Sequence, residues 1–324
     1  MANFLINQST NNNMAQATMA IDNLTEPLAG RSLWADAVTR LRRDRLAMIC
    51  FCIIAAYVLI AIVSPIVFGS WSNSQNYDNV NAAPSASHWL GTDTFGRDVL
   101  QKTLLGASTS MTVGFMANII AVPLGMFLGA VAGYYGGWVD DIIVWLYTTL
   151  TCIPGIILLI VLKFAFAGRA LLAGTPLEMD LGGMAGTYLA LGVISWIGTC
   201  RLVRAETMRL REMDYVLASR ASGRGPLAIL LRHILPNVTH LGIINFSLGF
   251  VGAIKAEVIL SYLGLGVTDR PSWGKMIDAA RMDVIVGRWW ELASAVVAMF
   301  IIVLAWSIFG DRLRDALDPK LKNT

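Results

Sequence analysis

Side chains that could carry chemistry are few and widely separated in this sequence. It contains no G-x-x-x-x-G-K-S/T phosphate-binding loop, no H-E-x-x-H zinc helix and no G-x-S-x-G nucleophile turn. The three histidines lie in different loops or segment boundaries, and the four cysteines lie in apolar segments without metal-ligand spacing. The sequence therefore predicts no catalytic residue, no metal site and no cofactor held by this chain.

Ionisable residues inside apolar stretches are the remaining candidates, and these are Lys163, Lys255 and Glu257. Such residues are typical of ion-coupled transport or of a polar pore, which keeps a self-contained secondary transporter or channel as an alternative. Lys255 and Glu257 cannot pair within one helix, because residues two apart point to different faces. We expect at least one of them, preferably Glu257, to bond groups in the segment 260–274, which contains Trp273, and to help close an outer gate. Snorkelling of both side chains to water is the other interpretation.

The elements that position these residues are expected to be membrane-spanning helices. The chain has 324 residues, of which 56% are hydrophobic and only 15% charged, and the apolar residues form long unbroken runs instead of periodic stripes. Since about 20 apolar residues cross a bilayer core as a helix, each long run predicts one span. The runs are 46–68, 103–138, 142–162, 181–200, about 237–262 and 292–310. The predicted fold class is all-α, a polytopic membrane protein with six transmembrane helices.

Basic residues indicate the orientation of these spans, because Lys and Arg in short flanking loops resist translocation. Five arginines precede the first span, seven lie between Arg201 and Arg232, and four basic residues follow the last span. Both termini and the loop after the fourth span are therefore expected on the cytoplasmic side. The expected divisions are a cytoplasmic tail and basic flank over 1–45, a first transmembrane helix over 46–68, an extracytoplasmic loop over 69–102, a core over 103–310 and a cytoplasmic tail over 311–324. Residues 1–30 are polar and Asn-rich, without the pattern of a signal peptide, so we expect a flexible tail.

The basic loop 201–236 carries a helix-turn-helix pattern. Residues 205–221 are good helix formers, Gly223 can supply a left-handed cap, and Pro226 suits the first turn of a second helix ending near Leu235 and Pro236. Small residues at Ala218, Ser219 and Ala221 would let a partner approach closely, and Tyr215 offers an apolar anchor. The alternative is a basic surface helix held by anionic lipid, and composition alone favours neither.

The spacing in this loop resembles a known signature. Ala218-Ser219, Gly223 and Leu235-Pro236 match the small pair, the Gly and the Leu-Pro of the EAA motif of ABC importer permeases. Leu217 stands where that motif often has Glu, and His233 where Ile is common. Five further stretches, in order along the chain, are similar to the C-type permease subunits of dipeptide, oligopeptide and nickel importers: 88–98, 133–140, 260–266, 271–274 and 315–319.

This resemblance implies an ABC type I importer permease fold in a bacterial cytoplasmic membrane. It implies import of di- or oligopeptides or a related small solute, with ATP and Mg bound and hydrolysed on separate subunits. The implied partners are a homologous permease, two ATPase subunits or domains, an extracytoplasmic solute-binding protein and membrane lipid, with no nucleic acid. The loop 201–236 would dock the ATPase, without the salt bridge that a Glu at position 217 would offer.

Two further patterns each have a functional and a plainer interpretation. Asp93, Arg97 and Asp98 could line an external entrance, although Thr92 or Asp93 capping the helix that follows is the preferred interpretation. Glycines recur every four residues at 125, 129 and 133 and put a smooth stripe on one helix face. Ordinary helix packing is preferred there over a substrate groove.

Overall fold

The computed structural model describes residues 33–317 except 71–73, 167, 172–178 and 268–269. Most of the expected tail over 1–45 and the end of the tail over 311–324 therefore lie outside the described residues. The α-helices are α2 (Leu33–Arg43), α3 (Arg45–Val67), α4 (Val99–Tyr135), α5 (Gly137–Thr151), α6 (Gly155–Phe166), α7 (Met184–Leu210), α8 (Asp214–Ala221), α9 (Pro226–Ile229), α10 (Leu235–Tyr262), α11 (Trp273–Ala280) and α12 (Trp290–Leu317). Short 3₁₀ turns cover Tyr77–Asn79 and Asp283–Val286, and a π-helical turn, η3, covers Leu230–Ile234.

Five helices in the described part of the chain are long and apolar enough to cross a membrane. They are α3, α4, α7, α12 and the continuous helix Pro226–Tyr262, and the bent pair α5 and α6 makes a sixth span if it is counted as one. The prediction of an all-α membrane protein with up to six spans is confirmed in this form. Two antiparallel strands of two residues each, β1 (Ala170–Leu171) and β2 (Met179–Asp180), are a small addition that the sequence did not indicate.

The third predicted span is not one straight helix. Its run 142–162 is split between α5 and α6, whose axes differ by 93°. The break lies at Pro154, which has no N–H to donate and whose ring disfavours helical backbone at the residue before it. The expectation of a continuous helix over this run was wrong for that reason.

The glycine stripe of α4 packs against α7. A Cβ atom added at Gly129 would lie 2.5 Å from the carbonyl oxygen of Cys200, and one at Gly133 would lie 2.6 Å from that of Arg204. The missing side chains therefore let two helix backbones touch, as small residues do in membrane bundles. The preferred interpretation, helix packing, is confirmed.

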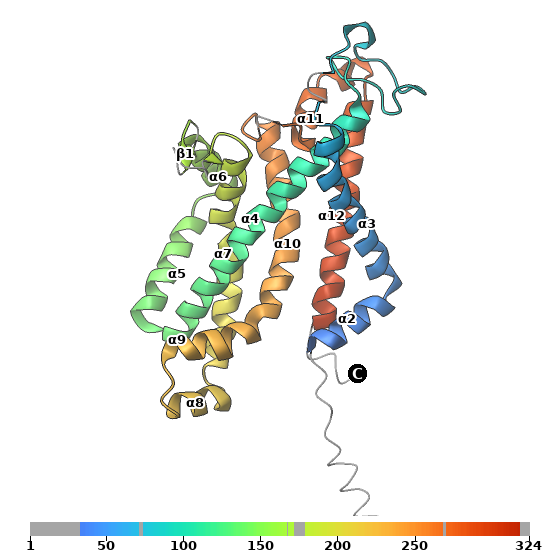
Figure 1. Ribbon diagram of the computed structural model, residues 1–324. Coiled ribbons are helices and arrows are strands. Elements are labelled where there is room, and N and C mark those ends of the chain that lie inside the picture. Colours follow the sequence, from blue (N-terminus) through green and yellow to red (C-terminus); the bar gives the residue numbers. More distant parts are fainter. Residues whose placement is uncertain (1–32, 71–73, 167, 172–178, 268–269, 318–324) are drawn as a thin grey trace, which may run out of the picture.

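The two ends of the bundle carry different elements (Figure 1). α8 and α9 lie at one end, called the α8 end, together with α2 and the last turns of α12. α11, the β1 strand and the loop that precedes α4 lie at the opposite end, called the α11 end. The residues singled out in the sequence fall at both ends, so the molecule has two candidate sites.

Candidate functional site

The short helix α8 is held to the bundle by few side chains and leaves most of its residues exposed. Val216 is fully buried and belongs to a cluster with Ile229, Leu230 and Ile234. The neighbouring Tyr215 and Leu217 are 42% and 41% exposed. The buried positions of α8, Val216 and Ser219, are three residues apart on one face, and apolar side chains lie on the exposed side. We call the exposed side of α8, with Tyr215, Leu217, Ala218 and Ala221, the α8 surface.

The predicted loop residues do not all lie on this surface. Ala218, Ala221, Gly223 and Pro226 are exposed, but Ser219 is buried and its Oγ has no hydrogen-bond partner within the described part of the chain. Gly223 has a φ of 76°, so the predicted left-handed cap is confirmed. A Cβ atom there would meet nothing within 4 Å, which means that the turn needs glycine for its backbone angle and not for lack of space.

The first predicted loop helix, 205–221, is wrong as a single element. α7 continues the fourth span as far as Leu210, three residues follow outside any helix, and α8 begins at Asp214. Arg211 stands at the end of α7 and donates from Nη1 to the carbonyl oxygen of Gly133, 3.1 Å away. Helix propensity does not report tertiary contacts of this kind, and no local pattern predicted the break.

The second predicted loop helix does not end near Leu235 and Pro236. Pro226 begins α9 as expected, but the helix passes through η3 into α10 without a stop. Pro236 follows this π-helical turn, whose wider hydrogen-bond spacing interrupts the regular ladder where proline has no N–H to donate. Pro236 is exposed and Leu235 is half-buried, at a joint inside one long helix instead of at a loop boundary.

Polar contacts tie α8 to that long helix. The Asn237 side chain donates from Nδ2 to the Tyr215 hydroxyl over 3.1 Å, and Arg224 Nη1 lies 3.1 Å from His233 Nε2. Close by, Arg204 of α7 binds both carboxylate oxygens of Asp140 in α5 at 2.5 Å. The first contact holds α8 to the long helix, and the last joins α5 to α7 at the same end. The Arg204–Asp140 pair was not predicted, because its partners are far apart in the chain and no local pattern joins them.

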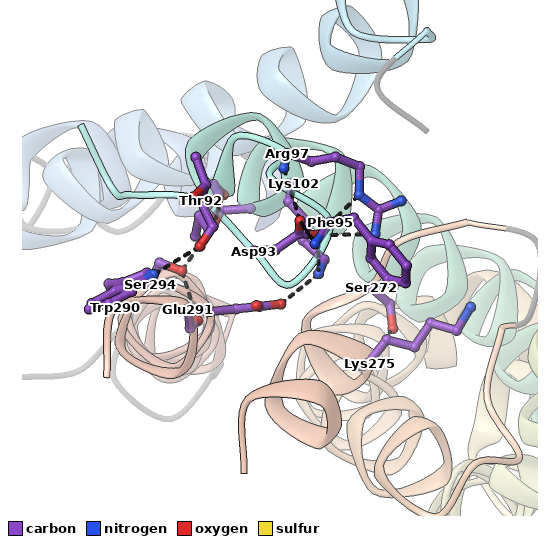
Figure 2. Close-up of polar contacts among 12 residues, drawn as sticks. Thr92, Asp93, Phe95, Arg97, Lys102, Ser272, Lys275, Trp290, Glu291 and Ser294 are labelled. Atoms are coloured by element: carbon purple, nitrogen blue, oxygen red, sulfur yellow. Dashed lines mark hydrogen bonds and ion pairs between the residues drawn. The ribbon is translucent and has the colours of Figure 1, made fainter. Parts of the chain in front are cut away.

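Four charged side chains form a cluster at the α11 end, called the Asp93 cluster: Asp93, Arg97, Lys102 and Glu291 (Figure 2). Asp93 Oδ2 accepts from Arg97 Nε at 3.0 Å and from Lys102 Nζ at 3.1 Å. Lys102 also donates to Glu291 Oε1 at 2.6 Å, which joins the start of α4 to the start of α12. Two acids and two bases thus balance one another in a buried place, where unpaired charge would be costly.

The charge of Asp93 is stabilised in the folded chain. Burial acts to raise the pKa of Asp93, but the positive charge of Lys102 and the N–H groups of Arg97 and Phe95 outweigh it and lower the pKa below 3.8. Asp93 accepts from both of those N–H groups at 2.9 Å. The side chain therefore holds its own loop as well as the cluster.

The preferred capping role of Thr92 or Asp93 was wrong. Asp98 caps α4 by accepting from the N–H of Gln101 at 3.1 Å, and it also lies 2.9 Å from His88 Nδ1. Asp98 therefore belongs to a different contact from Asp93 and Arg97. Lys102 and Glu291 are the residues that sequence reasoning missed. Each stands directly before the start of a predicted span, and that position was the one signal for them.

Glu257 lies at the same end and is completely buried. It accepts from the Ser110 hydroxyl at 2.8 Å and from the Ser261 hydroxyl at 2.7 Å, and Ser272 donates to Ser261 over 3.3 Å. The expected bond to the segment 260–274 is therefore present, through Ser261. Trp273, also buried, donates from Nε1 to the carbonyl oxygen of Thr103 at 3.1 Å.

The remaining ionisable residues of the spans have separate surroundings. Lys255 is exposed and lies on a different face from Glu257. Lys163 is buried and donates to the carbonyl oxygens of Gly182 and Gly183 and to the Thr187 hydroxyl, at 3.0 to 3.1 Å. Among the described residues there is no group of three or more His, Cys, Asp and Glu that could hold a metal. The arrangement offers fixed contacts between helices at one end and an open helix surface at the other.

Comparison with known proteins gives consistent matches along the chain. The family model described as binding-protein-dependent transport system inner membrane component matches residues 121–323, and that of the N-terminal TM domain of oligopeptide transport permease C matches residues 32–84. A dipeptide transport system permease protein of Alkalihalophilus pseudofirmus is 36% identical over 293 residues, which are 90% of this chain and 91% of that protein. A glutathione transport system permease protein of Shigella dysenteriae serotype 1 is 34% identical over 314 residues, which are 95% of this chain and 97% of that protein. A chain of an inward-facing MetNI methionine ABC transporter covers 68% of this chain with a TM-score of 0.47 and 19% identity, which is too distant to support an inference.

Proposed function

This chain belongs to the family of binding-protein-dependent transport system inner membrane components, and from that membership we propose that it conducts small peptides through the membrane while a separate ATPase docks on its α8 surface. It is the permease of an ABC importer. Membership implies a partner permease, ATPase subunits and a binding protein. We propose a homologous permease and two ATPase subunits or domains as the finer assembly.

The α8 surface carries the docking proposal. α8 is a helix of eight residues at one end of the bundle, fixed by buried Val216 and by the bond between Tyr215 and Asn237. Its outward side offers the small residues Ala218 and Ala221 beside two large apolar side chains. Small residues permit close approach and large ones supply anchoring area, which is what a groove on a partner protein requires.

The self-contained transporter or channel is disfavoured. Family membership places ATP hydrolysis on a separate subunit. The buried Lys163 and Glu257 also have hydrogen-bond partners from their own chain, which accounts for both without an ion pathway.

Peptides are the proposed solute class. The two relatives quoted are named for dipeptide and glutathione transport, and both names denote small peptides. Delivery would come from the binding protein at the α11 end. There the Asp93 cluster would keep the outer loop in a fixed shape, since its buried side chains are placed to brace helices and not to contact solute.

The proposed orientation puts the α8 end and both termini in the cytoplasm. Its test is thiol labelling in a variant whose four cysteines are replaced by serine. Ala86 and Arg224 are both exposed, at opposite ends of the chain's fold. Ala86→Cys should react with a membrane-impermeant thiol reagent in intact cells, and Arg224→Cys only after permeabilisation. The reverse pattern would invert the orientation.

Reconstitution tests the proposed function directly. The complete complex, placed in vesicles with its binding protein, should accumulate a labelled dipeptide or glutathione when ATP is supplied on the ATPase side. Accumulation should persist when a protonophore collapses the proton gradient and stop with a hydrolysis-deficient ATPase. Uptake that follows the proton gradient and ignores ATP would contradict the proposal.

A further inference from the structure

Helix α2 is amphipathic and lies across the ends of two spans. Its sequence, LWADAVTRLRR, has three arginines in the last turn. Ala37 is buried toward the bundle, whereas Val38 is 49% exposed. Figure 1 shows α2 bridging the lower ends of α3 and α12 at the α8 end of the bundle. A helix of this kind at the end of a membrane span is typical of the boundary between acyl chains and headgroups.

A groove of about 290 Å³ lies where α2, α3 and α12 meet. Its lining is apolar except for one arginine: Val38, Leu41, Arg42, Ala47, Met48, Phe51 and Phe309. Phe51 and Phe309 approach each other with ring centroids 6.0 Å apart, and Phe51 is 50% exposed. The groove therefore exposes apolar side chains along a membrane span and has a single cation among them.

A neighbouring hollow shows the contrast. It measures about 200 Å³ and is lined by Arg40, Leu41, Asp44, Arg312, Asp315 and Ala316. It holds two acids and two bases, and Arg312 Nε lies 3.4 Å from Asp44 Oδ2. Arg42, in contrast, has no ion-pair partner within residues 33–317 as far as they are described. The apolar groove therefore carries an exposed cation that has no ion-pair partner among the described residues, whereas the hollow holds two acids and two bases.

We propose that this groove binds one acidic phospholipid, with the phosphate on Arg42 and an acyl chain along Met48, Phe51 and Phe309. An acidic phospholipid offers an anionic headgroup and a long apolar chain in the required order. A basic pocket between helix ends at the membrane surface is suited to an anionic headgroup. Arginine is suited to it because its planar fork can bind two phosphate oxygens at once. The proposal requires that the chain spans a membrane and does not depend on which solute it carries.

Lipid retention by the purified complex tests this proposal. The complex is equilibrated with equal amounts of phosphatidylglycerol and phosphatidylcholine, and retained lipid is counted by native mass spectrometry. Wild type should retain one phosphatidylglycerol preferentially. Arg42→Gln should lower that preference roughly fivefold, the equivalent of about 1 kcal/mol for one basic residue near a charged surface. Phe51→Ala should weaken retention of both lipids, because it removes apolar contact area from the groove.

Arg232→Gln is the matched control, since Arg232 is an exposed arginine at the same end but outside the groove. It should leave retention unchanged, and inorganic phosphate should not displace the lipid. Equal losses in Arg42→Gln and Arg232→Gln would mean general attraction to the membrane and would overturn the proposal. Equal retention of the two lipids, or release of the lipid by millimolar phosphate, would also overturn the proposal.

Discussion

Lys102 of α4 and Glu291 of α12 form a buried ion pair with 2.6 Å between Nζ and Oε1, although 189 residues separate them in the chain. The same Lys102 holds Asp93, so one ammonium group joins the loop that precedes α4 to the first turns of two spans. Buried pairs of this kind contribute little net free energy when intact, but removing one partner is costly.

Lys102→Met should therefore destabilise the chain by roughly 3–5 kcal/mol, because two carboxylates remain buried near each other. The double variant Lys102→Met with Glu291→Leu should regain part of that loss. Arg281→Met is the control, since Arg281 pairs with Asp278 at 3.4 Å on the exposed surface; it should cost about 1 kcal/mol or less. Thermal unfolding in detergent measures all three. Equal losses for Lys102→Met and Arg281→Met would contradict a buried role for Lys102.

Acid should weaken the same cluster through Asp93. Since its folded pKa is lowered below 3.8, its contribution to stability is fully present above that value and is lost as the pH falls through the folded pKa. The difference in unfolding free energy between wild type and Asp93→Asn should therefore be constant from pH 7 to pH 5 and shrink below about pH 4. Unfolding measured along this pH series checks the prediction, and a difference that already shrinks near pH 6 would refute it.

Gly129→Ala should destabilise the chain, because the new Cβ atom would lie 2.5 Å from the carbonyl oxygen of Cys200. Forcing α4 and α7 apart should cost about 1–3 kcal/mol. Gly198→Ala is the matched control: Gly198 is also helical, and a Cβ atom there would meet nothing within 4 Å. That change should be neutral or stabilising by up to about 1 kcal/mol. The unfolding temperatures of the two variants measure this difference. A similar decrease in unfolding temperature in both would exclude the packing explanation.

The features of the fold that depend on local interactions could be predicted from the sequence. Bilayer thickness sets the length of an apolar run, so most spans could be found from composition. The turn at Gly223 and the start at Pro226 were predictable because each depends on the backbone angles of one residue. The bend between α5 and α6 also has a local signal, which is Pro154 itself.

The contacts that build the sites could not be found in the same way. Asp140 with Arg204 and Lys102 with Glu291 bring together residues from separate helices. Their pairing depends on how the helices pack, and no periodicity along the chain reports it. The contact of Arg211, just after α7, with Gly133 is of the same kind.

Glu257→Gln should reduce peptide uptake and the ATPase activity that the binding protein stimulates. The carboxylate accepts hydrogen bonds from Ser110 and Ser261, and an amide nitrogen in place of one oxygen would leave one hydroxyl without an acceptor. A buried group left unsatisfied costs about 1–3 kcal/mol. Lys255→Gln, on the exposed face of the same helix, should leave both activities unchanged. Normal transport by Glu257→Gln would end the proposed role of Glu257 in the outer gate.

Ala218→Glu and Gly223→Asp should give protein that is inserted at near-normal abundance but fails to retain its ATPase and fails to import. Ala218 lies on the α8 surface, and Gly223 has a φ of 76° that strains any side chain by roughly 1 kcal/mol or more. Co-purification of the ATPase is the measurement. Ala83→Glu, at an exposed alanine in the loop that precedes α4, is the control and should retain the ATPase. If retention survives both changes but is lost when Arg209, Arg211, Arg220 and Arg224 are replaced, docking is electrostatic and the α8 surface is not its site.

The passage from α9 through η3 into α10 makes one continuous helical segment of 37 residues, from Pro226 to Tyr262, which changes direction near η3 (Figure 1). Ile229 shares a buried cluster with Val216 near one end of this segment, and Glu257 lies near the other. Glu257, with its hydrogen bond from Ser110, and the buried contact of α8 therefore lie on one covalently continuous helical segment that links the two ends of the bundle.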